Sequence, residues 1–528
     1  MQRVWHVALL ASMSAVTLFA LQQRRTQRRA ARAPASAAVT KASAPPSVHH
    51  MELSIAGSFS HNGLFEQALA IYSRLLEASL AETPRRRAHL SHLYDLRSGI
   101  YETLRQFDLV IADTTAALQF DPSSSDMYLR RGIARAQRHE YTLALHDILA
   151  ALQYARSPDD TRDMEEMLRA LEQEAIYYEA RDALQNRPRC RPLPDDYEIQ
   201  AYFDSFHSRD LDPGVLELRQ RLAYDRHKST SLELLYTALE HRLAGRFVEG
   251  YRDLHQALEG LDLTHAVAPL GALEHGCYLH VLGRYDAAAT YFDRAAALVP
   301  HSPWICAHQV HNAIIRGDGL HAMAELTLAP STTSPTFAYL RGLHCDRVTG
   351  DETSAVAHWT RAISLAPEYV APYYAASQLY LRRQAPAAHS ILHQCLAWYY
   401  LYCAQTPSLG WIHHALGTYE ARCGRQATAR QCFETSLGVA PAFVPAYVAL
   451  AELAPEFERA QAYLMQALVH SRQAAPALLL AQLRAEHGRW GHAVDACDHA
   501  LQFAWDYRDL CHVFAVRNLA SAKALSAR

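Results

Sequence analysis

The sequence predicts an all-α fold, a solenoid of stacked helical hairpins, because one pattern of residues occurs twice at a fixed interval. Arg97 and Asp113 are followed 34 residues later by Arg131 and Asp147. Small, aromatic and aliphatic positions keep the same interval: Ser98, Phe107, Val110, Thr114 and Ala117 recur as Gly132, Tyr141, Ala144, Ile148 and Ala151. Repetition with this period is typical of tetratricopeptide repeats (TPRs), each of which is one pair of antiparallel helices.

The residue types at the repeated positions suit such a hairpin. Small residues such as Ser98 and Ala117 let two helices approach closely, and the aromatic Phe107 at the start of the second helix packs against the first. Pro122 ends the second helix, because proline cannot donate the backbone hydrogen bond that the next turn requires. Further copies of this pattern extend almost to Arg528.

Before the repeats, residues 4–21 carry no charged side chain and follow a short tip, residues 1–3. A helix of this length rises about 27 Å, close to the roughly 30 Å hydrocarbon core of a bilayer. Arginines follow the stretch on its C-terminal side: Arg24, Arg25, Arg28 and Arg29. We therefore expect a single transmembrane signal anchor, with the arginine flank and all that follows on the cytosolic side.

Two other interpretations of the N-terminus stay open. A cleaved secretory signal would carry its basic residues before the apolar stretch rather than after it. A transit peptide would be rich in arginine and free of acidic residues, which fits a chain whose first acidic residue is Glu52, but it would also be amphipathic. With a transit peptide, the protein would be a soluble organelle scaffold. A TPR co-chaperone or receptor on another membrane is a further alternative.

The remaining chain divides into two arrays of hairpins. Residues 22–52 are basic and then rich in Ala, Pro and Ser, as expected of a linker. Residues 53–187 contain three repeats and additional helices, and residues 211–528 contain about eight repeats and a capping helix. The connector between them, residues 188–210, has three prolines within seven residues. Its aromatic residues predict a segment that is held against a folded surface: Tyr197, Tyr202, Phe203 and Phe206. The alternative is an interdomain linker with a short amphipathic helix.

Composition and motifs exclude several classes of function. The formal net charge is −3, from 51 basic and 54 acidic residues, which argues against nucleic acid as a partner. No glycine-rich phosphate loop, GxSxG or HExxH motif is present, so we expect neither an enzyme nor a cofactor. The ten cysteines are scattered without a CxxC pair, as in a reducing compartment. Three histidine pairs lack a complementary ligand set, so we expect no metal site: His308 and His311, His389 and His393, His413 and His414.

Three segments resemble one known family. The stretch LPDDYEIQAYFDSF, Leu193–Phe206, is similar to the segment between the two TPR arrays of the seventy-kilodalton import receptor of the mitochondrial outer-membrane translocase, the TOM complex. MYLRRGIARA resembles that family's third repeat, and AQLRAEHGRWGHAVDACDHALQFA its last. The resemblance implies a receptor in the mitochondrial outer membrane that passes cytosolic preproteins to the import pore. The implied partners are preproteins with internal or hydrophobic targeting segments and the pore subunits of the translocase.

The resemblance also implies that the N-terminal array clamps the C-terminal carboxylates of cytosolic heat-shock chaperones. Such a clamp needs cationic and amide side chains from the first helices of three repeats. Arg130 matches the family's clamp, and Arg131 stands beside it. The other clamp positions hold residues that cannot bind a carboxylate, or that repel one: Leu53, Gly57, Leu96 and Asp126. We therefore expect the chaperone dock to be weak or altered, or the partner to be a different one.

For the C-terminal array, the resemblance implies a groove for hydrophobic helical preprotein segments. The first helices of its repeats carry many aromatic residues and histidines: Tyr278, Trp304, His308, His311, Tyr373, Tyr374, Trp411 and His413. An apolar groove with few charges would suit such ligands. The alternative is that most of these side chains simply pack one helix against another, so no single residue is assigned to the groove.

Overall fold

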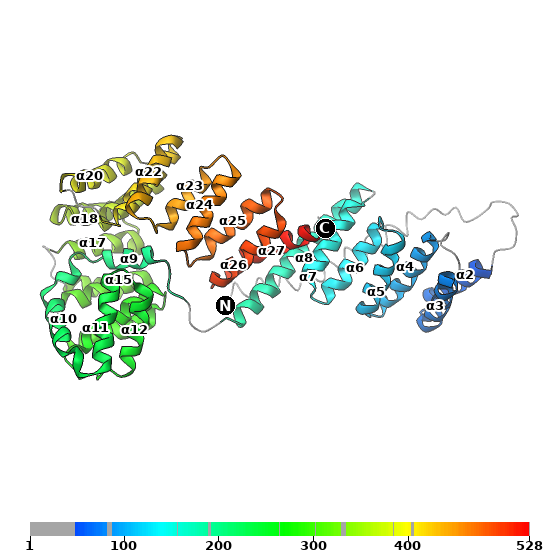
Figure 1. The fold of residues 1–528 in the computed structure, drawn as a ribbon, viewed down its shortest axis with the longest axis horizontal. Coiled ribbons are helices and arrows are strands. Elements are labelled where there is room, and N and C mark those ends of the chain that lie inside the picture. Colours follow the sequence, from blue (N-terminus) through cyan, green and yellow to red (C-terminus); the bar gives the residue numbers. More distant parts are fainter. Residues whose placement is uncertain are drawn as a thin grey trace. The chain divides into compact units, whose positions relative to one another are not determined.

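A computed structural model describes residues 48–81, 87–155, 157–187, 192–262, 264–300, 302–328, 334–383, 385–402 and 406–526. Within these ranges the regular elements are helices and no strand occurs (Figure 1). The expected membrane anchor and its arginines, Arg24, Arg25, Arg28 and Arg29, lie outside the described residues. None of the helices within the described ranges has the length and apolar character needed to cross a membrane.

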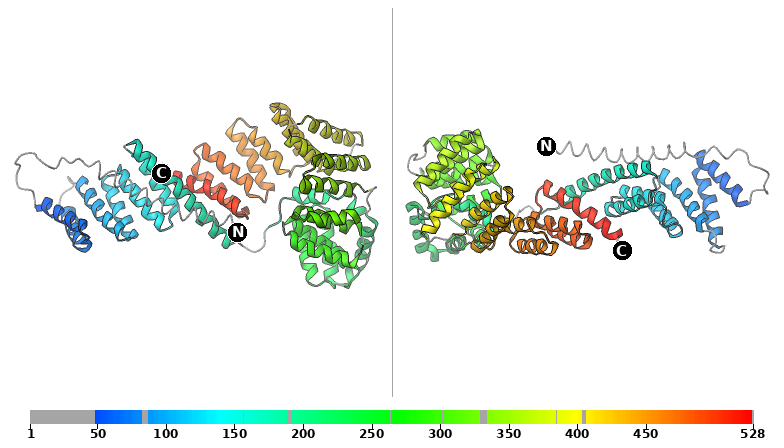
Figure 2. Two further views of the ribbon diagram at one scale, coloured as in Figure 1. Left: turned by 180° about the vertical axis from the view of Figure 1, so that it is seen from behind. Right: turned by 90° about the horizontal axis from the view of Figure 1, so that it is seen from above.

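The chain forms two compact units, Met1–Pro188 together with Ala477–Arg528, and Arg189–Pro476. In the first unit, three hairpins stack side by side and are followed by a long helix (Figures 1 and 2). Their helices are α2 (Val48–His61) and α3 (Phe65–Ala81), α4 (Arg87–Thr103) and α5 (Phe107–Phe120), α6 (Ser125–Gln137) and α7 (Tyr141–Gln153), then α8 (Pro158–Gln185). The described part of residues 53–187 thus contains three hairpins and one further helix.

The second unit begins with the connector helix α9 (Asp196–Asp204), and its described residues form six hairpins and a seventh whose first helix is short. The helices are α10 (Pro213–Asp225), α11 (Thr230–Leu243), α12 (Phe247–Glu259), α13 (Ala268–Val281), α14 (Tyr285–Leu298), α15 (Pro303–Arg316), α16 (Gly319–Leu328), α17 (Pro335–His344), α18 (Glu352–Leu365), α19 (Val370–Arg382), α20 (Ala387–Tyr402), α21 (Leu409–Arg422), α22 (Gln426–Val439), α23 (Val444–Glu452) and α24 (Phe457–His470). A π-helical turn, Cys345–Thr349, extends α17.

Close packing of a glycine against an aromatic ring recurs inside the hairpins. A Cβ atom added to Gly276 would come within 2.5 Å of the Phe292 ring, and one added to Gly342 within 2.3 Å of the Trp359 ring. Both rings are almost fully buried. Only a residue without a side chain lets the first helix approach the aromatic side of the second helix at this distance. The small and large positions of the sequence pattern therefore face each other as expected.

At the C-terminal end, the compact units and the expected arrays differ. The last three helices are α25 (Ala474–Glu486), α26 (Trp490–Phe503) and α27 (Tyr507–Ser526), and residues 477–528 belong to the first unit. The reason is that α27 packs against α7 and α8. For example, the Asn518 side-chain amide donates a hydrogen bond of 2.5 Å to the Glu179 carboxylate. The contacts thus divide the segment 211–528, which the sequence analysis treats as one array.

Candidate functional site

Arg130 on α6 is already paired with carboxylates of the neighbouring helix α4. Its guanidinium donates to the carboxylate of Asp95, to Glu102 Oε2 at 3.1 Å and to Ser98 Oγ at 3.0 Å. Burial lowers the pKa of Arg130, but the two carboxylates outweigh this effect and the net change is upward. A chaperone carboxylate that approached Arg130 would have to displace Asp95 and Glu102, with Asp126 as a further nearby negative charge.

Arg131 serves a different purpose, because it points into the hairpin. Its guanidinium donates to the two oxygens of Asp147 at 3.0 and 2.7 Å and to Thr115 Oγ1 at 3.2 Å. One repeat earlier, Arg97 pairs with Asp113 at 2.8 and 2.6 Å in the same way. The 34-residue spacing of these arginines and aspartates is thus a buried tie between the two helices of each hairpin.

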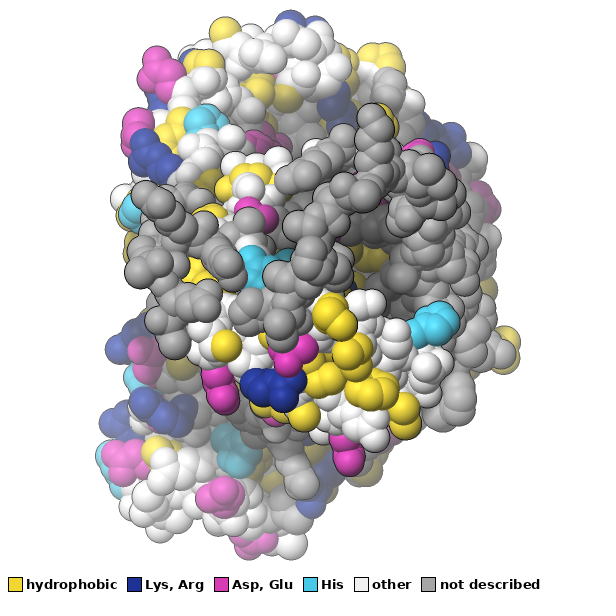
Figure 3. All heavy atoms as spheres, turned by 90° about the vertical axis from the view of Figure 1, so that its right-hand side faces the viewer, with side chains coloured by type: hydrophobic (Ala, Val, Ile, Leu, Met, Phe, Trp, Pro, Cys, Tyr) yellow, Lys and Arg dark blue, Asp and Glu magenta, His cyan; other side chains and the backbone are white. Residues whose placement is uncertain are grey.

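The other clamp positions of the first unit hold no positively charged side chain. Leu53 and Leu96 are partly buried against the apolar cluster of α2, α3 and α4, and Gly57 is exposed. Figure 3 faces the side on which Figure 1 draws α2 and α3, and apolar, acidic and basic side chains lie there next to one another. On the described part of this face, therefore, no single sign of charge dominates.

In the second unit, the aromatic residues and histidines of the first helices are mostly covered. Tyr278, Trp304, His308, His311, Tyr373, Trp411 and His413 are all buried, and only Tyr374 is partly exposed. Most of these side chains therefore pack against other helices rather than facing solvent. The physical reason is that the chain's own connector lies over part of this face.

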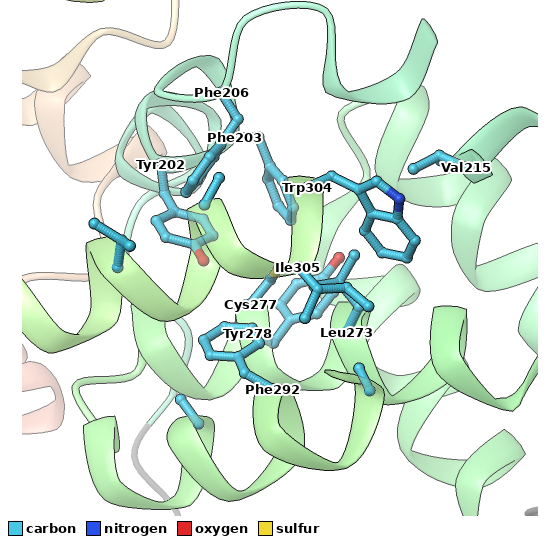
Figure 4. Packing of buried hydrophobic residues seen from close by; sticks show 14 of the residues in the cluster. Tyr202, Phe203, Phe206, Val215, Leu273, Cys277, Tyr278, Phe292, Trp304 and Ile305 are labelled. Carbon is cyan, nitrogen blue, oxygen red and sulfur yellow. The ribbon is translucent and has the colours of Figure 1, made fainter. Parts of the chain in front are cut away.

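The connector presents three aromatic side chains to the first helices. Tyr202, Phe203 and Phe206 are 7, 7 and 5% exposed. The ring of Phe203 lies 6.2 Å from that of Tyr278 on α13 (Figure 4), and the ring of Phe206 lies 3.7 Å from that of His308 on α15. The Tyr202 hydroxyl lies 2.8 Å from His308 Nδ1 of α15. The expected segment held against a folded surface is confirmed, and that surface is the face formed by the first helices of the second unit.

Buried ion pairs fix the connector to α11 and α13. Arg209 donates to Glu274 at 2.5 Å, and Arg242 to Asp210 at 2.6 Å. Arg242 Nε also lies 3.2 Å from Glu274 Oε2. The network balances two cations with two anions, so that burial leaves no net charge uncompensated. The two carboxylates raise the pKa of the Arg209 guanidinium although burial, the largest effect, lowers it.

Further contacts hold the two ends of the connector helix α9. Near its start, Asp195 accepts hydrogen bonds from Ser471 Oγ at 3.2 Å and from the Arg472 backbone amide. Near its end, the Ser408 hydroxyl bonds to Asp204. Contacts of the segment 195–210 therefore extend from α11 to the loop after α24. The connector therefore occupies this surface of the second unit in the way a bound peptide would.

A cavity lies next to the N-terminal end of α9. This cavity of about 570 Å³, here called the distal hollow, is formed by α21, α23, the first residues of α25 and Tyr197 of the connector. Its lining is mainly apolar and includes Val444, Val448, Ala449, Leu453 and Phe433. One cation and one anion, the exposed side chains of Arg422 and Glu452, also border it.

A second cavity of about 250 Å³, here called the small hollow, is also lined by Tyr197. Its lining includes Trp411, Val439 and Phe443. Tyr197 contributes to both cavities and packs edge-on against Phe443, with ring centres 5.2 Å apart. Tyr197 therefore borders both hollows, whereas Phe443 borders the small hollow.

Nothing in this arrangement points to metal binding. His389 Nε2 and His393 Nε2 lie 3.1 Å apart beside Glu420, but that carboxylate is paired with Arg425. Within the described ranges, no three His, Cys, Asp or Glu side chains form a group that could hold a metal ion. His414 borders the distal hollow, and burial lowers its pKa to about 4, so it is neutral at physiological pH.

Sequence reasoning did not identify the residues of the distal hollow. Val444 and Val448 lie four residues apart on α23 and so share one helical face. That spacing could have marked an apolar stripe, but the sequence does not show whether a stripe is covered by another helix. Thr418, Glu452 and Gln473, which complete the polar part of the lining, carry no motif.

Comparisons with known proteins support the fold. No protein-family model matches the chain. The crystal structure of yeast Tom70 is similar over 91% of this chain and 96% of that one, with 15% sequence identity and a TM-score of 0.51. A thermophilic TPR protein of Thermus thermophilus matches 35% of this chain and 98% of its own, with 23% identity and a TM-score of 0.30. At these identities, the similarity to yeast Tom70 shows a TPR solenoid fold.

Proposed function

We propose that this protein is a TPR receptor that binds polypeptide segments in the distal hollow of its second unit. The observation that carries the proposal is an apolar cavity of about 570 Å³ on the same face that holds the connector helix. Apolar grooves between helices bind amphipathic helices through a few large anchoring side chains. The Arg422 and Glu452 side chains at its border can orient such a ligand by charge.

We further propose that the receptor acts on the mitochondrial outer membrane and binds precursors with internal hydrophobic targeting segments. Two independent observations support this: the connector and repeat segments resemble the import-receptor family, and the fold is similar to yeast Tom70 along nearly the whole of both chains. The function is binding and release without chemistry. Precursors would pass from the hollow to the import pore, while the apolar segment 4–21 tethers the receptor.

A charge placed inside the distal hollow tests the binding site. In the full chain, Val448→Glu introduces a carboxylate among apolar side chains and should reduce binding of a labelled polytopic membrane-protein precursor at least tenfold. Val469→Glu is the matched control, because Val469 lies on α24 and is 72% exposed. Equal binding by both variants, measured by co-sedimentation, would exclude the hollow as the site.

A second experiment tests the location. Intact organelles that contain the protein should expose it to added protease and retain it after carbonate extraction, as expected of a cytosol-facing anchored receptor. Intact Met1 in the purified protein is also expected, because a signal anchor is not cleaved. Protection from protease in intact mitochondria, or cleavage after residue 21, would contradict the proposal and favour the soluble organelle scaffold.

A further inference from the structure

The connector, and not only the repeats, shapes the proposed binding site. Tyr197 belongs to α9, yet it lines the distal hollow together with residues of α21 and α23. It lines the small hollow as well, together with Trp411 and Phe443. No other residue is common to the two linings. Tyr197 of the connector is therefore the one side chain that borders both spaces.

The position of Tyr197 is fixed from both sides. Its ring contacts the buried ring of Phe443 edge-on, at 5.2 Å between centres. The backbone at the start of α9 is held by Asp195, which accepts hydrogen bonds from Ser471 and Arg472. Arg472 also pairs with Asp196 at 2.9 Å. A ring that is anchored in this way forms a rigid partition, because moving it would break these contacts.

We propose that Tyr197 is a specificity-determining residue, which restricts the distal hollow to polypeptides with one apolar anchor. This inference rests on the proposed function of the hollow. The ligand class is an amphipathic helix, as α9 illustrates, since α9 is itself a short helix that buries Tyr202 and Phe203 on this face. With Tyr197 in place, a second large side chain meets the ring. Without the ring, the small hollow of about 250 Å³ becomes available to it.

Fluorescence anisotropy with three labelled helical peptides tests the proposal on the full chain. The peptides have equal length and charge: one carries a single Phe, and two carry a second Phe four or seven residues later, one or two helical turns away. The wild type should bind the single-Phe peptide more tightly than either two-Phe peptide, because the second ring meets Tyr197. Tyr197→Ala should bind at least one of the two-Phe peptides about tenfold tighter than the single-Phe peptide, because a second ring is buried.

Two further variants keep the result interpretable. Tyr197→Phe retains the ring and should behave as the wild type, whereas Tyr197→Leu keeps an apolar contact with Phe443 and should still gain a preference for two anchors if the Ala variant is unstable. An unchanged preference in both Tyr197→Ala and Tyr197→Leu would overturn the role of Tyr197 while leaving the hollow as the site. Failure of the wild type to bind any of the peptides, or undiminished binding by Val448→Glu, would overturn the proposed site itself.

Discussion

The first helices of the two units differ in what occupies their side chains. In the first unit, Arg130 is neutralised by Asp95 and Glu102 of the adjacent helix. In the second unit, the aromatic residues and histidines are covered by a segment of the chain itself, and the open space lies beyond Tyr197. The position of a residue within a repeat therefore does not reveal whether it is available to a partner.

The largest effect is expected for a substitution that removes a contact between the connector and the first helices of the second unit. Phe203→Ala removes a buried ring that stacks on Phe247 and lies over the guanidinium groups of Arg209 and Arg242. We expect a loss of about 3 kcal/mol or more in the free energy of unfolding. Tyr224→Ala, at a residue that is 81% exposed in the same unit, should cost less than about 1 kcal/mol. Urea unfolding followed by circular dichroism measures both. Similar midpoints would mean that the connector contributes little to the second unit.

The next largest loss of stability is expected for the arginine–aspartate ion pair within a hairpin of the first unit. Asp147 is fully buried and accepts from Arg131 and Arg135, so Asp147→Ala leaves two cations without their partner. We expect a cost of about 3 kcal/mol. Asp113→Ala removes the equivalent carboxylate but frees only Arg97, whose side chain is 20% exposed, and should cost less. Equal unfolding midpoints for the two variants would contradict the ranking.

Low pH should destabilise the packing between the connector and the first helices of the second unit. Burial lowers the pKa of His280 to about 4 and those of His308 and His311 well below their usual value; Arg209 and Arg242 also disfavour protonation of His308. The unfolded chain binds these protons at a pKa near 6.5. The stabilisation is therefore complete above about pH 6.5 and is lost progressively as the pH falls towards 4. The urea midpoint should fall from pH 7 to pH 5, and less so in His280→Gln. Identical pH dependence in both proteins would exclude His280 as a contributor.

A smaller change in stability is expected for glycine substitutions at two turns of the first unit, and the two turns should respond differently. Arg105 and His139 both have left-handed backbones, with φ of 56° and 59°, where most hairpins have glycine. Arg105→Gly should stabilise the protein by about 0.5 kcal/mol, because relief of the backbone strain exceeds the entropy cost. His139→Gly should bring no gain, since His139 Nδ1 lies 2.7 Å from the Tyr141 hydroxyl and that contact is lost. Thermal unfolding measures the difference, and a higher Tm for His139→Gly than for Arg105→Gly would contradict it.

The smallest effect is expected at Arg130. Because its charge is balanced by Asp95 and Glu102, Arg130→Ala should leave binding of an acidic chaperone-tail peptide as weak as in the wild type. Pull-down with immobilised peptide measures retention. Strong retention by the wild type that Arg130→Ala abolishes would show that the carboxylates move aside and that the clamp operates.

The fold could be predicted largely from the sequence, because its determinants are local. The pairing of Gly276 with Phe292 and the 34-residue interval of Arg97 and Arg131 follow directly from the repeat. The residues of the candidate site could not be predicted from the sequence. The partners of Arg130 depend on how α4 and α6 are rotated against each other, and the distal hollow depends on where the connector ends. Both are set by tertiary packing, which the repeat pattern does not encode.

Photo-crosslinking tests the central claim most directly. A photoreactive phenylalanine at position 448 places the probe in the distal hollow, and the same residue at position 469 places it on the exposed side of α24. With a radiolabelled polytopic membrane-protein precursor and the full chain, position 448 should form a crosslink that position 469 does not, and unlabelled precursor should compete for it. Crosslinks of equal yield from both positions, or from position 469 alone, would contradict the account.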